Sequence, residues 1–247
     1  MPEISVVLPV WITNDELYSL TGKALESLMN SQGWGKCELI IIDNASPIGA
    51  DQLLSLADIY IRNKVNLGYV KAINQGLKLS QGSLIAVPNN DTRISPNWIQ
   101  VAKEVFQRDP KAGSLHFKMV GYNEPFNLGD AVWDKGKERW CQCSWFIWRK
   151  KAADQIQGLD ENYGLGGYDD WDWLLRMRRK GWKSMYTNAA AFQHKDSSTQ
   201  NILDQEKRKM SDNKNYEYFK SKFGEYPDKM WERLYPEQYK VPWRPYP

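Results

Sequence analysis

Ile4-Ser-Val-Val-Leu-Pro-Val10, near the N-terminus, is the stretch that decides the fold. Only Ser5 interrupts its apolar run, and the absence of polar alternation is typical of a strand that is covered on both faces. Residues 15–31 follow with apolar side chains at helical spacing, and Thr13 or Asn14 is placed to cap this helix. A buried strand followed directly by an amphipathic helix is the beginning of a β-α-β unit.

The same alternation continues through the first half of the chain. We predict strands at 39–42, 59–62 and 84–87, and helices at 47–56, 70–79 and from Ser95-Pro96 onward. Helical crossovers between strands indicate a mostly parallel sheet with helices on both faces, so we expect a Rossmann-like α/β fold. Ligands bind such sheets beyond the carboxyl ends of the strands. The residues brought to that edge are Pro9 and Val10, then Asp43, and then Asn89, Asn90 and Asp91.

The second half has a less regular pattern. Its predicted elements are an irregular segment at 121–139, strands at 144–148, 183–186 and 190–193, and a helix at 169–180. From Thr199 the chain is highly charged with helical spacing, and it ends in a tail rich in proline and aromatic residues. We therefore expect one α/β domain over residues 1–198 and a charged helical C-terminal extension over residues 199–247.

Composition and charge restrict the class of protein. The net charge is only +3 and 26% of the residues are charged, so no nucleic acid partner is expected. The apolar runs are far shorter than the roughly 20 residues that span a bilayer, and the N-terminal residues show no charged-then-apolar leader. The three cysteines lack the paired spacing of a metal site and are expected to be reduced thiols. These features favour a cytoplasmic protein.

Two of the strand ends are candidates for ligand binding. Asp43 ends an apolar strand, where a carboxylate can accept hydrogen bonds from a nucleobase or ribose, although the same residue could cap a turn. Asn89, Asn90 and Asp91 place a carboxylate beside amide oxygens, which a hard divalent cation prefers, although such residues are also common in turns. The residues alone leave both interpretations open at both places.

Three carboxylates, Asp169, Asp170 and Asp172, crowd the start of a predicted helix. They could simply complement the helix dipole, with Asp172 paired to Arg176 one turn later. Alternatively, mutual repulsion raises the pKa of one carboxyl group, which can then act as a general base near neutral pH. Asp170 and Asp172 point in different directions on a helix, so we expect only one of them to face a site.

Two further residue types are open to a structural or a functional interpretation. His194 closes a short strand and is either a structural residue or a metal ligand, and the second role requires Asp91 to be near it in space. The chain also has 12 tryptophans, several of them between residues 133 and 173. Their flat faces can fill a core or stack on sugar rings, so they are compatible with carbohydrate binding.

Several short motifs complete this pattern in chain order. They are Ser5-Val-Val-Leu-Pro9, Ile40-Ile-Ile-Asp43-Asn44-Ala-Ser46, Asn66-Leu-Gly68-Tyr-Val-Lys-Ala-Ile-Asn74-Gln-Gly76, Val87-Pro-Asn-Asn-Asp91, Ser144-Trp-Phe-Ile-Trp-Arg149, Gly158-Leu-Asp160-Glu161, Tyr168-Asp-Asp170-Trp-Asp172, Arg176 and His194. In order and spacing they resemble the inverting family-2 glycosyltransferases with the GT-A fold, particularly the rhamnosyltransferase-like branch. The resemblance covers residues 4 to about 198. It implies that residues 1–112 bind a nucleotide-sugar donor and that residues 113–198 form the acceptor and catalytic half.

The resemblance implies roles for particular residues. Asp43 matches the residue that holds the base of the nucleotide, and Asp170 matches the catalytic base, with Asp169 in the position of the family's glutamate. Asp91 matches the last acidic residue of the D-x-D element, which binds Mn²⁺ or Mg²⁺ on the donor diphosphate, and His194 matches the histidine that completes the metal site. The other implied donor-binding residues are Pro9, Val10, Asn66, Gly68, Lys71, Asn74, Asn89 and Asn90.

The implied reaction transfers a sugar from a UDP-, dTDP- or GDP-sugar to an acceptor hydroxyl of a carbohydrate or lipid-linked glycan. The first position of the D-x-D element is Asn89 here, a departure that removes one negative charge from the metal site. We expect the acceptor between residues 121 and 148 and after Thr199. The candidate acceptor contacts are Trp133, Trp140, Trp145 and Asp169. The charged tail could equally be a solvated face, a homodimer contact or a surface that lies peripherally on a membrane.

Two other classes of protein share some of these features. A nucleotide-sugar pyrophosphorylase also has a parallel α/β sheet, but it carries a Gly-rich basic loop after the first strand, and residues 9–14 contain no glycine. A non-catalytic carbohydrate-binding protein would use the tryptophans but would not need Asp91, Asp170 and His194. Metal-dependent hydrolysis of a nucleotide-sugar distinguishes an enzyme from such a binder.

Overall fold

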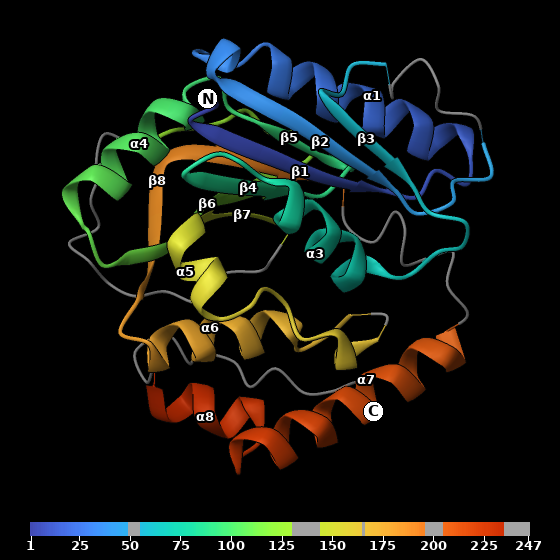
Figure 1. Ribbon diagram of the computed structural model, residues 1–247, viewed down its shortest axis with the longest axis vertical. Helices are drawn as coiled ribbons and strands as arrows, with labels where there is room; N and C mark the ends of the chain where they lie inside the picture. Colours follow the sequence, from blue (N-terminus) through green and yellow to red (C-terminus); the bar gives the residue numbers. More distant parts are fainter. Residues whose placement is uncertain (49–54, 130–143, 165, 196–204, 235–247) are drawn as a thin grey trace.

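The computed structural model describes residues 1–48, 55–129, 144–164, 166–195 and 205–234. Its centre is an eight-stranded sheet in the order β3-β2-β1-β4-β7-β6-β8-β5 (Figure 1). The strands are β1 (Ile4–Val10), β2 (Cys37–Asp43), β3 (Ile59–Arg62), β4 (Leu84–Pro88), β5 (Thr92–Ile94), β6 (Ala112–Gly121), β7 (Trp145–Arg149) and β8 (Lys183–His194). The helices are α1 (Asp15–Met29), α3 (Tyr69–Leu79), α4 (Trp98–Arg108), α5 (Lys150–Gln155), α6 (Asp169–Arg179), α7 (Gln205–Phe223) and α8 (Pro227–Leu234), with short 3₁₀ turns η1 (Trp34–Lys36) and η2 (Glu161–Tyr163).

The first half of the chain folds as the sequence predicts. β1 pairs in parallel with β2 and β4, and β2 pairs in parallel with β3. Every residue of β1 is buried, because helices cover both faces of this part of the sheet. Asn14 caps α1 by accepting a hydrogen bond from Leu17 N at 2.8 Å. Most of the helix predicted at 47–56 lies outside the described residues.

The second half mixes strand directions and departs from the prediction. β7 runs antiparallel to β4 and β6, and β5 runs antiparallel to β8, while β6 and β8 are parallel. The sequence pattern did not indicate β5 or β6, and it predicted two short strands where β8 is continuous. β8 is continuous across the gap between the two predicted strands, and its register with β6 shifts there, with Phe117 paired to Thr187 and Lys118 paired to Ala191. Helix α4 begins at Trp98 rather than at Ser95-Pro96.

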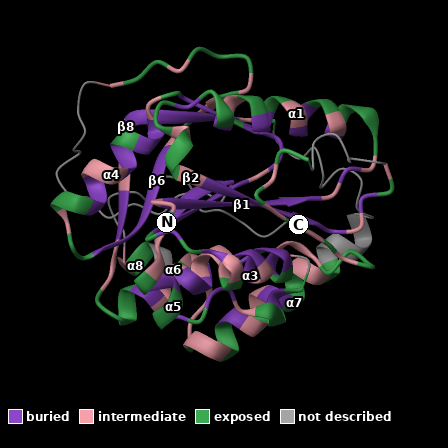
Figure 2. Cartoon of the chain, turned by 45° about the horizontal axis from the view of Figure 1, so that its top comes forward, coloured by how far each residue is buried: buried purple, intermediate pink, exposed green. Residues whose placement is uncertain are grey.

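Two hydrophobic cores lie on opposite faces of the sheet. Helices α1 and α4 cover one face, and α3, α5 and α6 cover the other. Figure 2 shows β1 buried between these layers and the outer surface of α1 exposed. Helices α7 and α8 lie on the outer side of α6 (Figure 1), where a third apolar cluster includes Tyr163, Phe219 and Met230. The predicted α/β fold with helices on both faces and a helical C-terminal segment is therefore confirmed. None of the helices in the described ranges is long and apolar enough to cross a membrane.

Candidate active site

The carboxyl edge of the parallel strands gathers most of the predicted strand-end residues. Val10, Asp43 and Arg62 occupy matching register positions across β1, β2 and β3. Residues 89–91 follow β4, the next strand in the sheet. This is the edge at which open α/β sheets bind ligands.

Asp91 and His194 are neighbours in space although they are far apart in the sequence. Thr92 pairs with His194 across β5 and β8, which brings His194 Nε2 to 3.3 Å from Asp91 Oδ1. The two side chains are nearly buried, with exposed fractions of 12% and 6%. The proximity that a metal-binding role for His194 requires is therefore present.

Buried polar atoms around this pair favour a polar ligand. In the described part of the chain, Asn89 Oδ1, Asp91 Oδ1 and Tyr122 OH are buried and form no hydrogen bond. The pKa of Tyr122 is raised, chiefly by burial and also by the negative charge of Asp91, and the positive charge of Arg93 offsets part of this shift. Unpaired buried polar atoms cost free energy, so such a group is expected where an ion, a ligand or water completes the set. Tyr122 could not be predicted as a site residue, because it follows Gly121, which pairs with His194 only through the unpredicted strand β6.

The atoms of this group fit a divalent cation as a partial coordination shell. Carboxylate and amide oxygens are ligands that Mg²⁺ and Mn²⁺ prefer, and an imidazole nitrogen is a ligand for transition-metal ions. Over the described ranges, no three or more His, Cys, Asp or Glu side chains are arranged to hold an ion. The pair that the structure brings together consists of Asp91 and His194, and Asn89 lies two residues before Asp91 in the chain.

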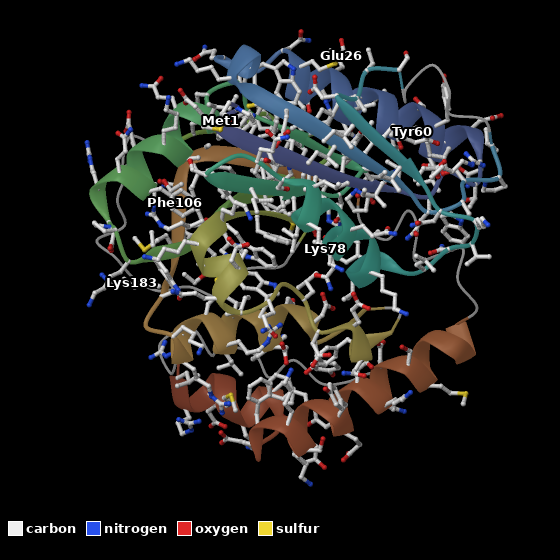
Figure 3. The ribbon with its side chains drawn as sticks, viewed as in Figure 1. Met1, Glu26, Tyr60, Lys78, Phe106 and Lys183 are labelled. Atoms are coloured by element: carbon white, nitrogen blue, oxygen red, sulfur yellow. The ribbon has the colours of Figure 1, made fainter. Side chains whose placement is uncertain are left out.

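Asp43 is fully buried and already engaged by protein groups. Its Oδ1 accepts a hydrogen bond from Ser46 N at 2.8 Å, and its Oδ2 accepts one from Tyr60 OH at 2.9 Å and one from Arg62 Nη1 at 2.5 Å. Tyr60 lies on the edge strand β3, as Figure 3 shows. The contact with Ser46 agrees with the turn-cap interpretation. Arg62, 46% exposed, is held at the edge by Asp43. It could not be predicted as a site residue, because strand register is not visible in the residue pattern.

The segment from Asn66 to Asn74 connects this edge to the loop before α6. Gly68 has φ +86°, and a Cβ atom there would lie 3.1 Å from the carbonyl oxygen of Gly164, so the two backbones approach closely. Asn74 is buried; its oxygen accepts a hydrogen bond from Leu159 N, and its amide donates one to Leu159 O, each at 2.9 Å. Asn74 therefore fastens α3 to the loop, while Asn66 Oδ1 accepts a hydrogen bond from Gly68 N.

The remaining predicted donor residues differ in their surroundings. Pro9 and Val10 are buried at the end of β1. Asn90 is buried and donates a hydrogen bond to Thr21 Oγ1 at 2.9 Å, which anchors the end of β4 to α1. Lys71 is exposed on α3.

Asp169 and Asp170 begin α6 after a loop with an unusual backbone. The described residues that precede them have positive φ angles, which are Gly164 (+58°), Gly166 (+107°), Gly167 (+95°) and Tyr168 (+65°). Glycine adopts such angles without a steric penalty, so the loop can turn sharply before the helix. Asp169 Oδ1 accepts a hydrogen bond from Gly167 N at 2.8 Å, which ties the helix start to the loop.

The two carboxyl groups at this helix start have raised pKa values. Burial raises the pKa of Asp169, and it raises the pKa of Asp170 further because the charge of Asp169 adds to the effect. Asp169 is buried, whereas Asp170 is only half-buried and so can meet a substrate. A partly accessible carboxyl group with a raised pKa is suited to act as a general base.

Asp172 points into the protein rather than toward the site. It is fully buried and forms the predicted ion pair with Arg176. It also lies 2.5 Å from Lys222 Nζ and accepts a hydrogen bond from Tyr163 OH at 3.3 Å. Of the two predicted candidates, Asp170 and Asp172, the partly exposed Asp170 is the one that a ligand can reach.

Trp145 is a core residue rather than an acceptor contact, which corrects the sequence-based expectation. It is 1% exposed in β7, and its ring centroid lies 5.0 Å from that of Trp98 and 5.4 Å from that of Phe117. A ring enclosed on all sides cannot stack on a sugar. Trp133 and Trp140 lie outside the described residues.

The fold and the site together define the class of protein. A mixed, curled α/β sheet with helices on both faces is consistent with the fold of the GT-A glycosyltransferases. Residues 5–158, more than half of the chain, match Glycosyl transferase family 2, and the chain belongs to this family.

Relatives and solved structures agree with this assignment. The chain is 22% identical over 257 residues to the uncharacterized protein y4gI of Sinorhizobium fredii, covering 90% of this chain and 28% of that protein. It is 29% identical over 136 residues to the beta-monoglucosyldiacylglycerol synthase of Trichormus variabilis, covering 52% of this chain and 28% of that protein. The chain thus spans little more than a quarter of either relative. The mannosyltransferase PcManGT of Pyrobaculum calidifontis, whose structure was solved in complex with GDP-Man and Mn²⁺, has a similar fold, with a TM-score of 0.58. The two chains are 17% identical, and the match covers 77% of this chain and 56% of the mannosyltransferase.

Proposed function

We propose that this glycosyltransferase moves a sugar from a nucleotide-sugar donor to an acceptor hydroxyl by a single displacement that inverts the anomeric carbon. The observation that carries the proposal is the half-buried Asp170, whose pKa burial raises at the start of α6. The loop before it touches the donor segment where Gly164 meets Gly68. A base beside the donor segment is what a displacement by a hydroxyl requires.

Asp170 acts on the acceptor in this proposal. Its carboxylate takes the proton of the acceptor hydroxyl while the hydroxyl oxygen bonds to the anomeric carbon on the side opposite the nucleotide. The bond from that carbon to the diphosphate oxygen breaks, and the diphosphate leaves with the electron pair. Asp169 keeps the pKa of Asp170 high, so the base is strong enough to accept the proton.

The donor side of the site is assigned to the edge residues. Asp91 and His194, with Asn89, would hold Mn²⁺ or Mg²⁺, which when bound supplies a Lewis acid for the departing diphosphate. The Mn²⁺ and GDP-Man found with the mannosyltransferase of Pyrobaculum calidifontis support this class of ligand. We assign the nucleotide to Asp43 acting together with Arg62, whose guanidinium it orients.

The finer features of the reaction are carried over from the resemblance. We propose a donor half at residues 1–112, an acceptor and catalytic half at residues 113–198, and a rhamnosyltransferase-like specificity. The acceptor is a carbohydrate or a lipid-linked glycan. The short apolar runs of the sequence favour a cytoplasmic enzyme. The charged extension over residues 199–247 would then serve an acceptor, membrane or homodimer contact.

A donor screen tests the proposed function. UDP-, dTDP- and GDP-sugars are each added with and without Mn²⁺, and thermal shift and hydrolysis are measured. We expect one donor to stabilise the protein by about 2 kcal/mol at saturating concentration, and to be slowly hydrolysed, only with the metal. Asp91→Asn should remove both the stabilisation and the donor hydrolysis that depend on the metal. Asp154→Asn, at an exposed carboxylate on α5, should leave both unchanged. A folded protein that responds to no donor would support a non-catalytic sugar binder instead.

The rate of donor hydrolysis should depend on pH through Asp170. Its pKa lies above the ordinary value of 3.8 because of burial and the charge of Asp169, so the active carboxylate form is lost at a higher pH than for an exposed aspartate. We expect kcat/KM to fall as the pH decreases well before it reaches about 4. Thermal unfolding at each pH is the control for loss of the folded protein. A rate that stays constant down to about pH 4.5 would contradict this role.

A further inference from the structure

Helix α7 contributes one face of side chains to the loop that precedes Asp170. Asn215, Tyr218, Phe219 and Lys222 lie three or four residues apart and therefore on one side of the helix. Asn215 is 2% exposed and Phe219 is fully buried. Figure 1 shows α7 running along the outer side of α6 and of the chain that leads into it. The C-terminal helix is thus packed against the segment that carries the base.

Asn215 forms a set of hydrogen bonds that is unusual for a single side chain. Its amide donates to the carbonyl oxygens of Tyr163 and Gly166 at 2.8 Å each, and to that of Gly167 at 3.2 Å. Gly166 and Gly167 have positive φ angles and lie outside the helices and strands, so their carbonyl oxygens need partners other than a regular ladder of hydrogen bonds. The three bonds from Asn215 supply a fixed attachment in its place.

A second attachment holds the other end of the same helix. Lys222 Nζ lies 2.5 Å from carboxylate oxygens of both Asp160 and Asp172, and Tyr218 OH donates to Asp160 at 2.9 Å. Burial alone would raise the pKa of Asp160, but Lys222, the Asn162 N–H and Tyr218 lower it to about 2. The loop and α6 are therefore fixed to α7 at two points.

The path from Asn215 to the base is short. A Cβ atom at Gly167 would lie 2.8 Å from Asp212 Oδ1 on α7, which shows how closely the helix approaches the loop. Gly167 accepts from Asn215 through its carbonyl and donates to Asp169 through its N–H. Asp170 follows Asp169 directly. A shift of the loop at Gly167 would therefore shift the base.

We propose that Asn215 is a positioning residue for the glycosyl transfer, and that its amide sets where Tyr163, Gly166 and Gly167 hold Asp170 relative to the acceptor hydroxyl. This inference rests on the proposed function, in which Asp170 is the base. An asparagine suits the place because it donates two N–H groups, whereas an aspartate of the same shape would direct a negative oxygen toward three carbonyl oxygens. Displacements of about 1 Å at such positions can cost up to about 100-fold in rate.

The test compares Asn215→Ala with Asn213→Ala in the full chain. Asn213 is exposed on the same helix, so the matched variant controls for helix propensity. Turnover of the UDP-, dTDP- or GDP-sugar that the wild type hydrolyses is measured with Mn²⁺. We expect Asn215→Ala to lower kcat by about tenfold with a smaller change in the KM for the donor, because Asp43, Arg62 and Asp91, to which the donor is assigned, lie on other elements. Wild-type kcat and pH profile in a folded Asn215→Ala protein would overturn the inference.

A second readout does not depend on turnover. The side-chain carboxyl of Asp170 is titrated by ¹³C NMR, with Asp170→Asn used to assign its signal. The charges around the loop are Asp169, Asp212 and the Lys222 ion pairs, and Asn215→Ala changes none of them. Loosening the loop admits water, so the titration should move toward the ordinary aspartate value, and an unmoved titration would count against the inference.

The two proposals can fail separately. If Asp170→Asn turns over donor at the wild-type rate, the function assigned to Asp170 fails, whatever Asn215 does to its titration. If Asp170→Asn is inactive while Asn215→Ala leaves kcat and the titration unchanged, only the positioning role fails. Asn215→Ser, which keeps one hydroxyl donor, replaces Asn215→Ala if the alanine variant does not fold, and an intermediate loss of kcat is then expected.

Discussion

Replacing Asp170 with Asn is expected to lower turnover by about two orders of magnitude or more while donor binding stays near its wild-type strength. The substitution keeps the size of the side chain but removes the group that accepts the proton, and a positioned general base contributes on the order of 10²–10⁴ in rate. Asp170 is half-buried, and its Oδ1 accepts a hydrogen bond from Trp171 N at 2.9 Å that an asparagine oxygen can also accept. The fold should therefore survive the change.

The measurement separates chemistry from binding. Donor affinity is determined by calorimetry with Mn²⁺, and turnover is followed by release of the nucleoside diphosphate. Asp154→Asn removes an exposed carboxylate that pairs with Lys150 on the surface, and it should leave both quantities unchanged. Unimpaired turnover in Asp170→Asn would remove this residue from the role. A loss confined to donor affinity would assign it to binding instead.

The first half of the fold could be predicted because its physical signals are local. β1 is buried on both faces, so its apolar run is visible without knowledge of its neighbours. The edge of the sheet follows from parallel topology alone, which is why Asp43 and Asp91 could be selected. Strand register could not be read in this way, and so Arg62 beside Asp43 was missed.

The second half could not be predicted to the same extent because its contacts are non-local. β6 contains His116, which is fully buried and stacked on Trp173 of α6 at 5.8 Å, so its polar residues conceal a core strand. Burial lowers the pKa of His116 to about 3, which keeps it neutral in this setting. The approach of His194 to Asp91 depends on the pairing of β5 with β8, which the sequence pattern did not indicate.

The contacts of helix α7 could not be predicted for a different reason. Its contact face uses Asn215 and Lys222, residue types that normally indicate solvent, and a charged pattern of this kind predicts a solvated helix. The structure instead directs both side chains inward to carbonyl and carboxylate groups. Polar burial of this kind becomes visible only when the partners are known, because an unpaired lysine or asparagine would not be buried.

The ion pairs of Lys222 should make a large contribution to stability. Asp172 is fully buried, and Lys222 and Arg176 are the cations that face it among the described residues. Lys222→Met keeps much of the apolar stem but leaves Asp160 and Asp172 short of a positive charge. Removing one partner of a buried pair destabilises proteins by about 3–5 kcal/mol, and we expect about 3 kcal/mol here because the Lys222 side chain is 26% exposed.

Urea denaturation of Lys222→Met checks this expectation, and Lys214→Met on the exposed side of α7 is the matched control.

The pH dependence of the unfolding free energy adds a second check. Asp160 has a folded pKa of about 2, below its ordinary value of 3.8, so its contribution is complete above pH 3.8 and is lost as the pH falls toward 2. Lys222→Met should weaken this acid-dependent loss. Equal unfolding free energies for wild type and Lys222→Met would mean that the burial of Asp172 is compensated by Arg176 and Tyr163 alone, and α7 would then hold the base-bearing loop chiefly through Asn215 and the apolar cluster around Phe219.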